Sequence, residues 1–589
     1  MFEDATIDYK DVIFLVLLIS LYTTLFSIFS YLRYADFFTY NWDLGINMQM
    51  LYSTLHGHLL YETADFQTMG VGTFLEVHSG YIAYFIAYIY AIEPIATTLF
   101  IIQSLVVSLS SIPLLMILKN VIKQRNLQYS VIFLFLFNFF IISSILYDFH
   151  WEAFVPVEFF TFFYLVINRR YKLSILIIIL GALTLEVIPL LMAGLFAYLF
   201  LERVFINIYG KGVPLITDVK PIVSLILMTL SVVVFFIIEV IQLFILPRYF
   251  PVFSSKSTTA GPLYSAFSLH FFGTQYFTVL TYWLAILFSL GFISIFNKRL
   301  ILISLPWLIF TFFISPYYGS FIGYQYGFIA LPPIFISFIY GLRKMVSGDE
   351  SSTKHINTSI VKYSLLLFYL TFSALFIFMS FIYKNTGLIL SLSQYSIFLS
   401  FVTFVFPLAI IFSMKITRST KGRIKISRLK NNSIFNGILF FIAVLILVNI
   451  SLSPLNTQNF QKTPMPGYSF LYYENPASSS MGQLISYMPT NSTVVASDNL
   501  FPYVANNLNS YSFMWYRNES VSRFFPFNST HLPEYLLVDD YQFGFIPNYI
   551  SKLMFTPQGY ETVAYINNSG YPGNIYLLKL GYTGIQIKI

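Results

Sequence analysis

The chain of 589 residues contains no cysteine, and only 10% of its residues are charged. The missing cysteines exclude disulfides, thiolate metal sites, cysteine nucleophiles and CxxC redox motifs. A typical soluble domain carries about 25% charged residues. At 57% hydrophobic residues, a soluble form of this chain would expose apolar patches larger than soluble monomers tolerate. These two shortages exclude a soluble enzyme, a disordered chain and a coiled coil.

Nucleotide-binding and hydrolase motifs are missing as well. The chain has no P-loop, GxGxxG, HExxH or GxSxG sequence, so an ATP-driven pump or a serine hydrolase has no support. The net charge of +7 does not point to nucleic acid either. The densest basic run, at 415–430, follows an apolar segment, and such runs anchor membrane proteins on anionic lipid. We therefore expect membrane lipid, and no nucleic acid, as a partner.

The chain is rich in long apolar segments. A helix needs about 20 apolar residues to cross a bilayer, and thirteen segments approach or reach that length. They are 12–33, 95–118, 129–146, 152–168, 173–186, 188–202, 221–246, 276–296, 300–314, 327–342, 362–383, 394–414 and 434–453. The segment 79–93 is shorter, and we expect it to lie at the membrane interface.

The basic residues assign a direction to these segments, because positive charges concentrate in the cytoplasmic loops of membrane proteins. With a cytoplasmic N-terminus, thirteen spans place 23 of the 33 Lys and Arg residues on the cytoplasmic side. An extra crossing at 79–93 would place most of them outside. We predict a multi-pass cell-membrane protein with an all-α transmembrane domain over 1–453, a long first outer loop at 34–94 and an extracellular C-terminal domain.

The composition changes near residue 454. From there to residue 589 the chain is polar, with short alternating stretches at 492–497, 534–540, 561–566 and 574–580 and an expected helix at 481–489. We predict a small extracytoplasmic α/β domain over 454–589. Four N-x-S/T sequons agree with that side of the membrane and predict glycosylation at Asn491, Asn518, Asn528 and Asn567.

Acidic and imidazole side chains gather in the predicted outer loops of the first six spans. The candidate site residues among them are Asp43, His78, His150, Glu152 and Glu186. Carboxylates and imidazoles on one face can act as a general base. They can also bind a hard divalent cation, and we expect Mg²⁺ or Mn²⁺ at Asp43 and Glu152.

The same residues have structural explanations that the sequence leaves open. Asp43 precedes an amphipathic stretch at 44–57 and can be the N-cap of an interfacial helix. His78 can be a polar interfacial residue at the start of 79–93. His150 and Glu152 can belong to a solvated turn.

Three glutamates near or within the predicted spans also have a simpler explanation. Glu186 can be a carboxylate that reaches water from a break between two short spans. Glu158 and Glu239 fall inside predicted spans, where ionisable groups are costly and are functional candidates by default. A neutral glutamate that is hydrogen-bonded between helices accounts for each of these two without any chemistry.

Several short segments resemble a largely uncharacterised family of polytopic membrane proteins from archaea and bacteria. The strongest is WDLGINMQMLYSTLHG (42–57), in which Asp43, Gly45 and Gln49 match the family pattern. The others are EVHSGYIAYFIAYIYAIEP (76–94), YDFHWEAFVPV (147–157), ALTLEVIPLLMAGL (182–195), YQYGFIALPPIFI (324–336) and LISYMPTNSTVVASDNLFPYVAN (484–506).

That family is distantly similar to the GT-C glycosyltransferases, which include oligosaccharyltransferases and protein O-mannosyltransferases. The resemblance implies a GT-C-like helical fold and transfer of a sugar from a polyprenyl-phosphate-linked donor at the outer face. Asp43 would be the general base or a cation ligand, and Glu152 the second acidic element. His78, His150 and Glu186 would line the substrate site, and Arg248 and Lys256 are candidates for holding the lipid phosphate.

Two functions without catalysis remain open. The chain can be a transporter or scramblase of a lipid-linked saccharide, or a scaffold that displays the outer domain. A transporter usually places ionisable groups near the midplane of several helices. Here the charges concentrate at the outer rim, which favours chemistry at the rim.

Overall fold

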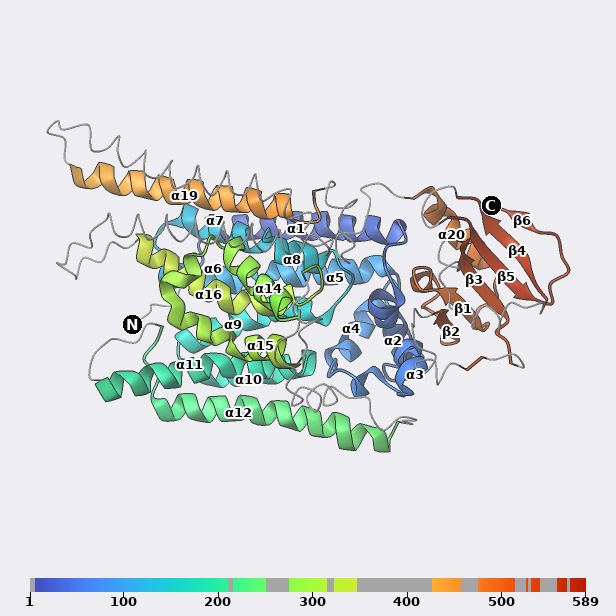
Figure 1. Ribbon diagram of the computed structural model, residues 1–589, viewed down its shortest axis with the longest axis horizontal. Coiled ribbons are helices and arrows are strands. Elements are labelled where there is room, and N and C mark those ends of the chain that lie inside the picture. Colours follow the sequence, from blue (N-terminus) through green and yellow to red (C-terminus); the bar gives the residue numbers. More distant parts are fainter. Residues whose placement is uncertain are drawn as a thin grey trace.

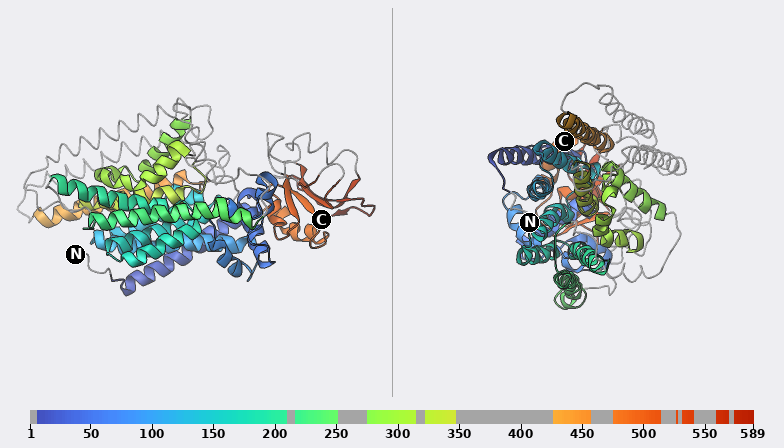
Figure 2. Two further views of the ribbon diagram at one scale, coloured as in Figure 1. Left: turned by 90° about the horizontal axis from the view of Figure 1, so that it is seen from below. Right: turned by 90° about the vertical axis from the view of Figure 1, so that its left-hand side faces the viewer.

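Up to Leu452, the regular structure of the described residues is helical, and a six-stranded sheet follows near the C-terminus (Figure 1). The computed structural model describes residues 6–209, 216–250, 275–314, 322–346, 426–456, 475–513, 526–527, 531–540, 559–568 and 573–589. The helices form an elongated bundle, and the sheet lies beyond one of its ends (Figure 2). We call this end of the bundle the sheet end.

Six helical stretches in the described residues are long and apolar enough to cross a membrane, which confirms a membrane protein. Each matches a predicted span: Tyr9–Ala35 (α1), Ala96–Val121, Ile188–Ile208, Pro221–Arg248, Gly327–Met345 and Phe435–Leu452. The second combines α5 (Ala96–Leu109) and α6 (Ser111–Val121). The others belong to α11 (Ile188–Tyr209), α12 (Pro221–Val240) with η4 (Ile241–Ile245) and η5 (Leu246–Arg248), α16 (Gly327–Val346) and α19 (Ile426–Leu452).

The predicted count of thirteen spans is not confirmed. The span 129–146 is a bent pair, because α7 (Arg125–Leu136) and α8 (Phe139–Ile145) meet at 46°. Helices of 13–15 residues reach only about 20–22 Å, short of the ~30 Å hydrocarbon core. These are α9 (Val155–Ile167), α10 (Tyr171–Thr184) and α14 (Gln275–Ser289). The prediction at 300–314 corresponds to η6 (Ile293–Ser304), α15 (Leu305–Ile309) and η7 (Phe310–Ile314). The spans 362–383 and 394–414 lie outside the described residues.

The end of the bundle away from the sheet carries basic residues at helix termini. Lys119 in the last turn of α6 donates to the Thr6 carbonyl at 2.7 Å and pairs with Asp11 near the start of α1. Arg125 begins α7 and pairs with Asp8. This grouping agrees with the predicted sorting of basic residues, while the side of the membrane stays a prediction.

The first loop folds into short helices between the bundle and the sheet (Figure 1). They are η1 (Asn41–Gly45), α2 (Ile46–Leu55), α3 (Thr63–Met69), η2 (Phe74–Glu76) and α4 (Ile82–Tyr90). The nine residues of α4 are too few to cross a bilayer, as predicted for 79–93. One face of α4 buries Ala83, Ala87 and Tyr90, while Phe85 and Tyr88 on the other are about 60% exposed.

The sheet is mixed, with the strand order β2-β1-β3-β5-β4-β6. The strands are β1 (Val494–Ser497), β2 (Ser510–Phe513), β3 (Tyr535–Asp539), β4 (Tyr560–Ile566), β5 (Ile575–Leu580) and β6 (Ile587–Lys588). The four predicted strands are therefore confirmed, and the predicted helix at 481–489 is α20 (Pro476–Ser486). The prediction missed β2 because its SYSF sequence is half polar and very short.

A buried glutamine joins the sheet to the first loop. Gln49 in α2 is fully buried, and its amide nitrogen donates to the carbonyls of Asn507 and Ser510 at 3.0 and 3.1 Å. Its amide oxygen accepts from the backbone N–H and the hydroxyl of Thr63 at 2.9 and 3.0 Å. Gln67 in α3 adds a bond to the Ser512 carbonyl at 3.1 Å. We call this contact of residues 41–67 with residues 498–512 the docking seam.

Gln49→Leu tests how strongly this glutamine holds the seam. The substitution leaves buried carbonyl and N–H groups unpaired, and we expect a loss on the order of 2–4 kcal/mol of unfolding free energy. Thermal unfolding together with limited proteolysis between bundle and sheet measures it. Gln483→Leu, on the exposed side of α20, is the matched control and should change neither readout. Equal behaviour of the two variants would contradict the assigned role.

Candidate functional site

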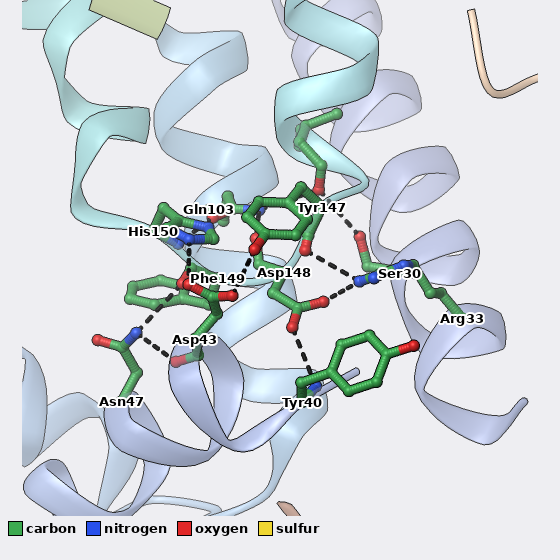
Figure 3. A network of polar contacts seen from close by, with 11 residues as sticks. Ser30, Arg33, Tyr40, Asp43, Asn47, Gln103, Tyr147, Asp148, Phe149 and His150 are labelled. Carbon is green, nitrogen blue, oxygen red and sulfur yellow. Dashed lines mark hydrogen bonds and ion pairs between the residues drawn. The ribbon is translucent and has the colours of Figure 1, made fainter. Parts of the chain in front are cut away.

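Asp43 lies in η1 at the sheet end, and both of its carboxylate oxygens contact the turn 147–150 (Figure 3). Oδ1 is 2.8 Å from His150 Nε2, and Oδ2 accepts from the Tyr147 hydroxyl at 2.7 Å. The rings of Tyr147 and His150 stack with their centroids 4.9 Å apart. The side chain of Asp43 is 17% exposed, so the carboxylate is held on two sides and still reaches the surface.

These contacts keep Asp43 ionised. Burial alone would raise the pKa of Asp43, but the charge and hydrogen bond of His150, the Tyr147 hydroxyl and the more distant Arg33 together lower it below its usual value. Burial and the charge of Asp43 raise the pKa of Tyr147 well above its usual value, so the phenol stays a donor. The N-cap explanation for Asp43 is wrong, because α2 begins at Ile46 without a side-chain cap.

The turn that presents Tyr147 and His150 is fastened to α1 and α5. Arg33, near the end of α1, forms a buried ion pair with Asp148 and donates to the Tyr147 carbonyl at 2.9 Å. Gln103 in α5 donates to the Asp148 carbonyl at 2.8 Å and accepts from the His150 N–H at 2.7 Å. Asp148 has a φ of 151°, which L residues rarely adopt, so these contacts hold a strained turn in place.

Asn47 connects the two halves of this arrangement. Its side-chain amide donates to the carbonyl of Asp43, one helical turn earlier, at 2.7 Å. It also donates to the Phe149 carbonyl at 3.1 Å. Asn47 therefore fixes η1 against the turn 147–150, in addition to the bonds that the Asp43 carboxylate makes.

A second charged pair joins the first loop to the break between α10 and α11. His78 Nδ1 lies 3.2 Å from Glu186 Oε1, and the Ser79 N–H donates to Glu186 Oε2 at 3.1 Å. Glu186 is 4% exposed and His78 is 42% exposed. The predicted break is confirmed, but the Glu186 carboxylate faces His78 and Ser79 and does not reach water.

The two partners of this pair shift each other's pKa. Burial lowers the pKa of His78, but Glu186, with smaller effects from Glu152 and Asp65, outweighs burial and raises it to about 9. Burial raises the pKa of Glu186, but His78 and the Ser79 N–H outweigh burial and lower it below its usual value. Both groups are therefore charged at neutral pH.

Glu152 lies between the two pairs. Its pKa is raised, chiefly by burial, while the charges of His150 and His78 act in the opposite direction and Glu186 adds to the rise. The pKa of the half-buried Glu152 carboxyl is therefore affected both by His150, beside Asp43, and by the His78–Glu186 pair. The five sequence-selected residues are brought into a single electrostatic environment, although they come from three separate segments.

The other residues singled out from the sequence lie apart from these two pairs or outside the described residues. Arg248 is exposed at the end of η5. The segment that carries it lies near η2, because Gln242 donates to the Leu75 carbonyl at 3.2 Å. Lys256 lies outside the described residues. Glu158 is buried and accepts from the Thr184 hydroxyl at 2.7 Å, so it is hydrogen-bonded between α9 and α10. Glu239 is buried in α12.

Two of the four sequons can be located. Asn491 and Asn567 are exposed on the sheet domain, and Asn518 and Asn528 lie outside the described residues. Their glycosylation stays a prediction.

The expected divalent cation has no clear set of ligands. Within the described ranges, no group of three or more His, Asp or Glu side chains is arranged to hold a metal ion. Both oxygens of Asp43 are already bound to Tyr147 and His150. The Mg²⁺ or Mn²⁺ expected at Asp43 and Glu152 stays a prediction, and the proposed chemistry requires none.

Sequence reasoning missed the residues that hold the site together. Tyr147 contacts Asp43 itself, and Arg33, Gln103 and Asp148 hold the turn 147–150 in place beside it (Figure 3). Arg33 offered one signal: it is the only basic residue between Lys10 and Lys119, at the end of an apolar segment. Asp148 offered another, because it is an acidic residue of a predicted outer turn, while Gln103 and Tyr147 offered none without knowledge of their partners.

The helices and the loop with its polar site define a polytopic membrane protein that carries a small sheet domain at one end. Within that class, the chain belongs to the family described as predicted membrane protein (DUF2079), whose model matches residues 33–390 and 387–552. The first match contains every residue from Arg33 to Glu186 described above. No curated protein matches the sequence. The predicted uncharacterised membrane family is confirmed, and the likeness to GT-C glycosyltransferases stays a prediction.

Arg33→Met tests the buried ion pair. Asp148 would remain buried without its cation, and removal of one partner of such a pair costs roughly 3–5 kcal/mol. The double variant Arg33→Met/Asp148→Asn should recover part of the loss because no isolated charge is left. Thermal unfolding of the wild type, the single variants Arg33→Met and Asp148→Asn and the double variant in detergent measures this, and strictly additive losses would contradict a direct interaction.

The His78–Glu186 pair predicts a measurable pH dependence. Because the pKa of His78 is raised to about 9, the pair is intact at neutral pH and is lost as the pH rises through about 9. Titration of the ¹⁵N-labelled histidine ring, assigned with His78→Gln, reads this midpoint directly. In Glu186→Gln the midpoint should fall toward the ordinary value, because burial is then opposed only by the smaller effects of Glu152 and Asp65. An unchanged midpoint would contradict the pairing.

Proposed function

We propose that the protein is a membrane glycosyltransferase that moves a sugar from a polyprenyl-phosphate-linked donor to an acceptor. The observation that carries the proposal is Asp43, an ionised, partly exposed carboxylate held between His150 and Tyr147 at one rim of the bundle. A carboxylate in that state can accept a proton from a nucleophile. The proposal places this rim and the sheet domain outside the cell, as the sorting of basic residues predicts.

The proposed reaction divides between two parts of the site. The acceptor's oxygen or nitrogen attacks the anomeric carbon, its proton passes to Asp43, and the bond from that carbon to the phosphate oxygen breaks. The leaving group is the lipid phosphate, which needs positive charge nearby. His78 is 42% exposed and its pKa of about 9 keeps it cationic at neutral pH. Exposed Arg248, near η2, is a second candidate for the phosphate.

The remaining residues support these two. His150 and Tyr147 orient the carboxylate and keep it deprotonated until the acceptor is bound. Glu186 holds His78 in its charged form. Glu152 carries a raised pKa and therefore holds a proton more readily than an ordinary glutamate, which suits exchange of a proton with bound substrate. The chemistry is then general-base and electrostatic catalysis by the chain's own groups.

Two further readings compete with this one, a transporter of a lipid-linked saccharide and a scaffold for the sheet domain. The buried, hydrogen-bonded Glu158 and the buried Glu239 are the deep ionisable groups that a transporter would use. A scaffold would need the rim carboxylates only for stability. Both alternatives predict that the wild type transfers no sugar, so that substitution at Asp43 has no transfer activity to remove.

Asp43→Asn in reconstituted membranes separates these functions. The amide keeps the size of the side chain but cannot take a proton, so we expect transfer from a polyprenyl-phosphate sugar to fall by a factor of about 100 or more. Glu93→Gln, an exposed position at the end of the same loop, is the matched control and should retain full activity. Transfer by Asp43→Asn at the wild-type rate would rule out the catalytic assignment, and absence of transfer in the wild type would favour a transporter or a scaffold.

A further inference from the structure

The sheet domain contacts the same short helix that carries Asp43. The N–H of Asn41, the first residue of η1, donates to the Asp498 carbonyl at 3.1 Å. At the last residue of η1, the buried Phe501 ring lies directly against Gly45, where a Cβ would be 2.5 Å from its Cδ1 atom. Asp43 is therefore between two contacts with the sheet domain, one at each end of its helical turn.

The turn itself needs such support. η1 is a π-helical turn, in which the Gly45 N–H bonds to the Tyr40 carbonyl at 3.1 Å. Such turns are rare and occur mostly as single turns at functional sites. A change to the ordinary α-helical register would rotate Asp43 relative to α2 and away from His150. What holds the wider turn in place thus also decides where the carboxylate points.

The sheet domain also contacts the end of α1. Tyr503 stacks on Tyr34 with ring centroids 4.4 Å apart and donates to the Tyr34 carbonyl at 3.0 Å. Tyr34 follows Arg33, which fastens the turn 147–150. Residues 498–503 therefore contact η1, which carries Asp43, and the end of α1, which fastens the turn that carries His150.

We propose that the C-terminal sheet domain positions the Asp43 carboxylate, with Phe501 against Gly45 and the Asp498 carbonyl on Asn41 holding η1 in the register that points Asp43 at His150. Phe501 and Asp498 are positioning residues in this account, and the site is complete only when the domain is docked. The inference concerns the position of a side chain and does not require the transfer reaction.

The chemistry of Asp498 agrees with this arrangement. Its carboxyl is buried at the end of β1, and burial, with a further contribution from the charge of Asp43, raises its pKa to about 7. A second ionised carboxylate beside Asp43 would be repulsive, so the protonated form suits the docked domain. The Ser512 hydroxyl lies 3.5 Å from its Oδ1.

Gly45→Ala tests the contact directly, because the added methyl group has no room against Phe501. The readout is the ¹⁵N spectrum of the His150 ring in bilayers, where only seven histidines contribute and His150→Gln assigns the signal. Asp43→Asn defines the spectrum of a ring that has lost its carboxylate partner. We expect Gly45→Ala to move the His150 signal toward that spectrum.

Restoring the fit should restore the signal. The double variant Gly45→Ala/Phe501→Leu makes room for the methyl group, and its His150 spectrum should return toward wild type. The matched control Asn506→Ala removes contacts of the same sheet domain with Tyr90 and the Pro94 carbonyl, which lie outside η1 and the docking seam, and should leave His150 unchanged. If Gly45→Ala does not fold, Phe501→Leu alone is the milder second variant. Its His150 signal should also move toward the Asp43→Asn spectrum.

Two results would overturn the proposal. One is a wild-type His150 signal in Gly45→Ala, whether or not protease releases the sheet domain. The other is a change in Asn506→Ala as large as that in Gly45→Ala. An activity measurement, which rests on the proposed function, would add a fall in kcat of up to about 100-fold with little change in KM. Failure of the activity assay alone would bear on the reaction and not on the positioning of Asp43.

Discussion

A charge removed from water must find an opposite charge or hydrogen bonds, and this requirement organises the sheet end of the molecule. The chain has few charges, and three pairs of ionisable side chains meet here: Asp43 with His150, Arg33 with Asp148, and Glu186 with His78. Each pair joins segments more than 100 residues apart in the sequence. The pairs therefore specify how the first loop lies on the helices, a task for which apolar contacts within a membrane provide little direction.

The position of the site follows from the same constraint. Helices as short as α9 and α10 leave turns within the protein at the sheet end, where backbone and polar side chains can bind one another. The turn 147–150 and the break at 185–187 are two such places, and the first loop covers both. The sheet domain packs on the loop through the docking seam. The polar site therefore lies next to a folded domain at the rim of the bundle.

The sequence predicts which residues lie near one another better than it predicts how they pair. Asp43, His78, His150, Glu152 and Glu186 stand out because ionisable residues are scarce, and the structure brings them into one environment. Their pairing could not be predicted, because it depends on the π-helical turn at 41–45 and the strained Asp148, neither of which has a sequence signature. The role of Tyr147 could not be predicted either, because nothing in the sequence distinguishes the one tyrosine among 45 whose hydroxyl contacts Asp43.

The fold, too, was predictable from the sequence only in part. Long apolar segments and an alternating strand were predictable from the sequence pattern, as α1, α12 and β5 show. The number of crossings was not, because a window of apolar residues does not reveal the bend at Asn138 between α7 and α8 or the early ends of α9 and α14. Gln49 matches the family pattern, yet only the structure shows that it joins the first loop to the sheet domain.

The central claim is that the rim around Asp43 and His78 binds a lipid-linked sugar phosphate, and photo-crosslinking tests it most directly. A photoreactive polyprenyl-phosphate sugar is irradiated with the protein in bilayers, and the modified residues are mapped by mass spectrometry. The account predicts adducts on η1, on residues 147–152 and around residues 78 and 186, all suppressed by excess unlabelled donor. Adducts confined to other parts of the bundle, or none that the donor suppresses, would contradict it.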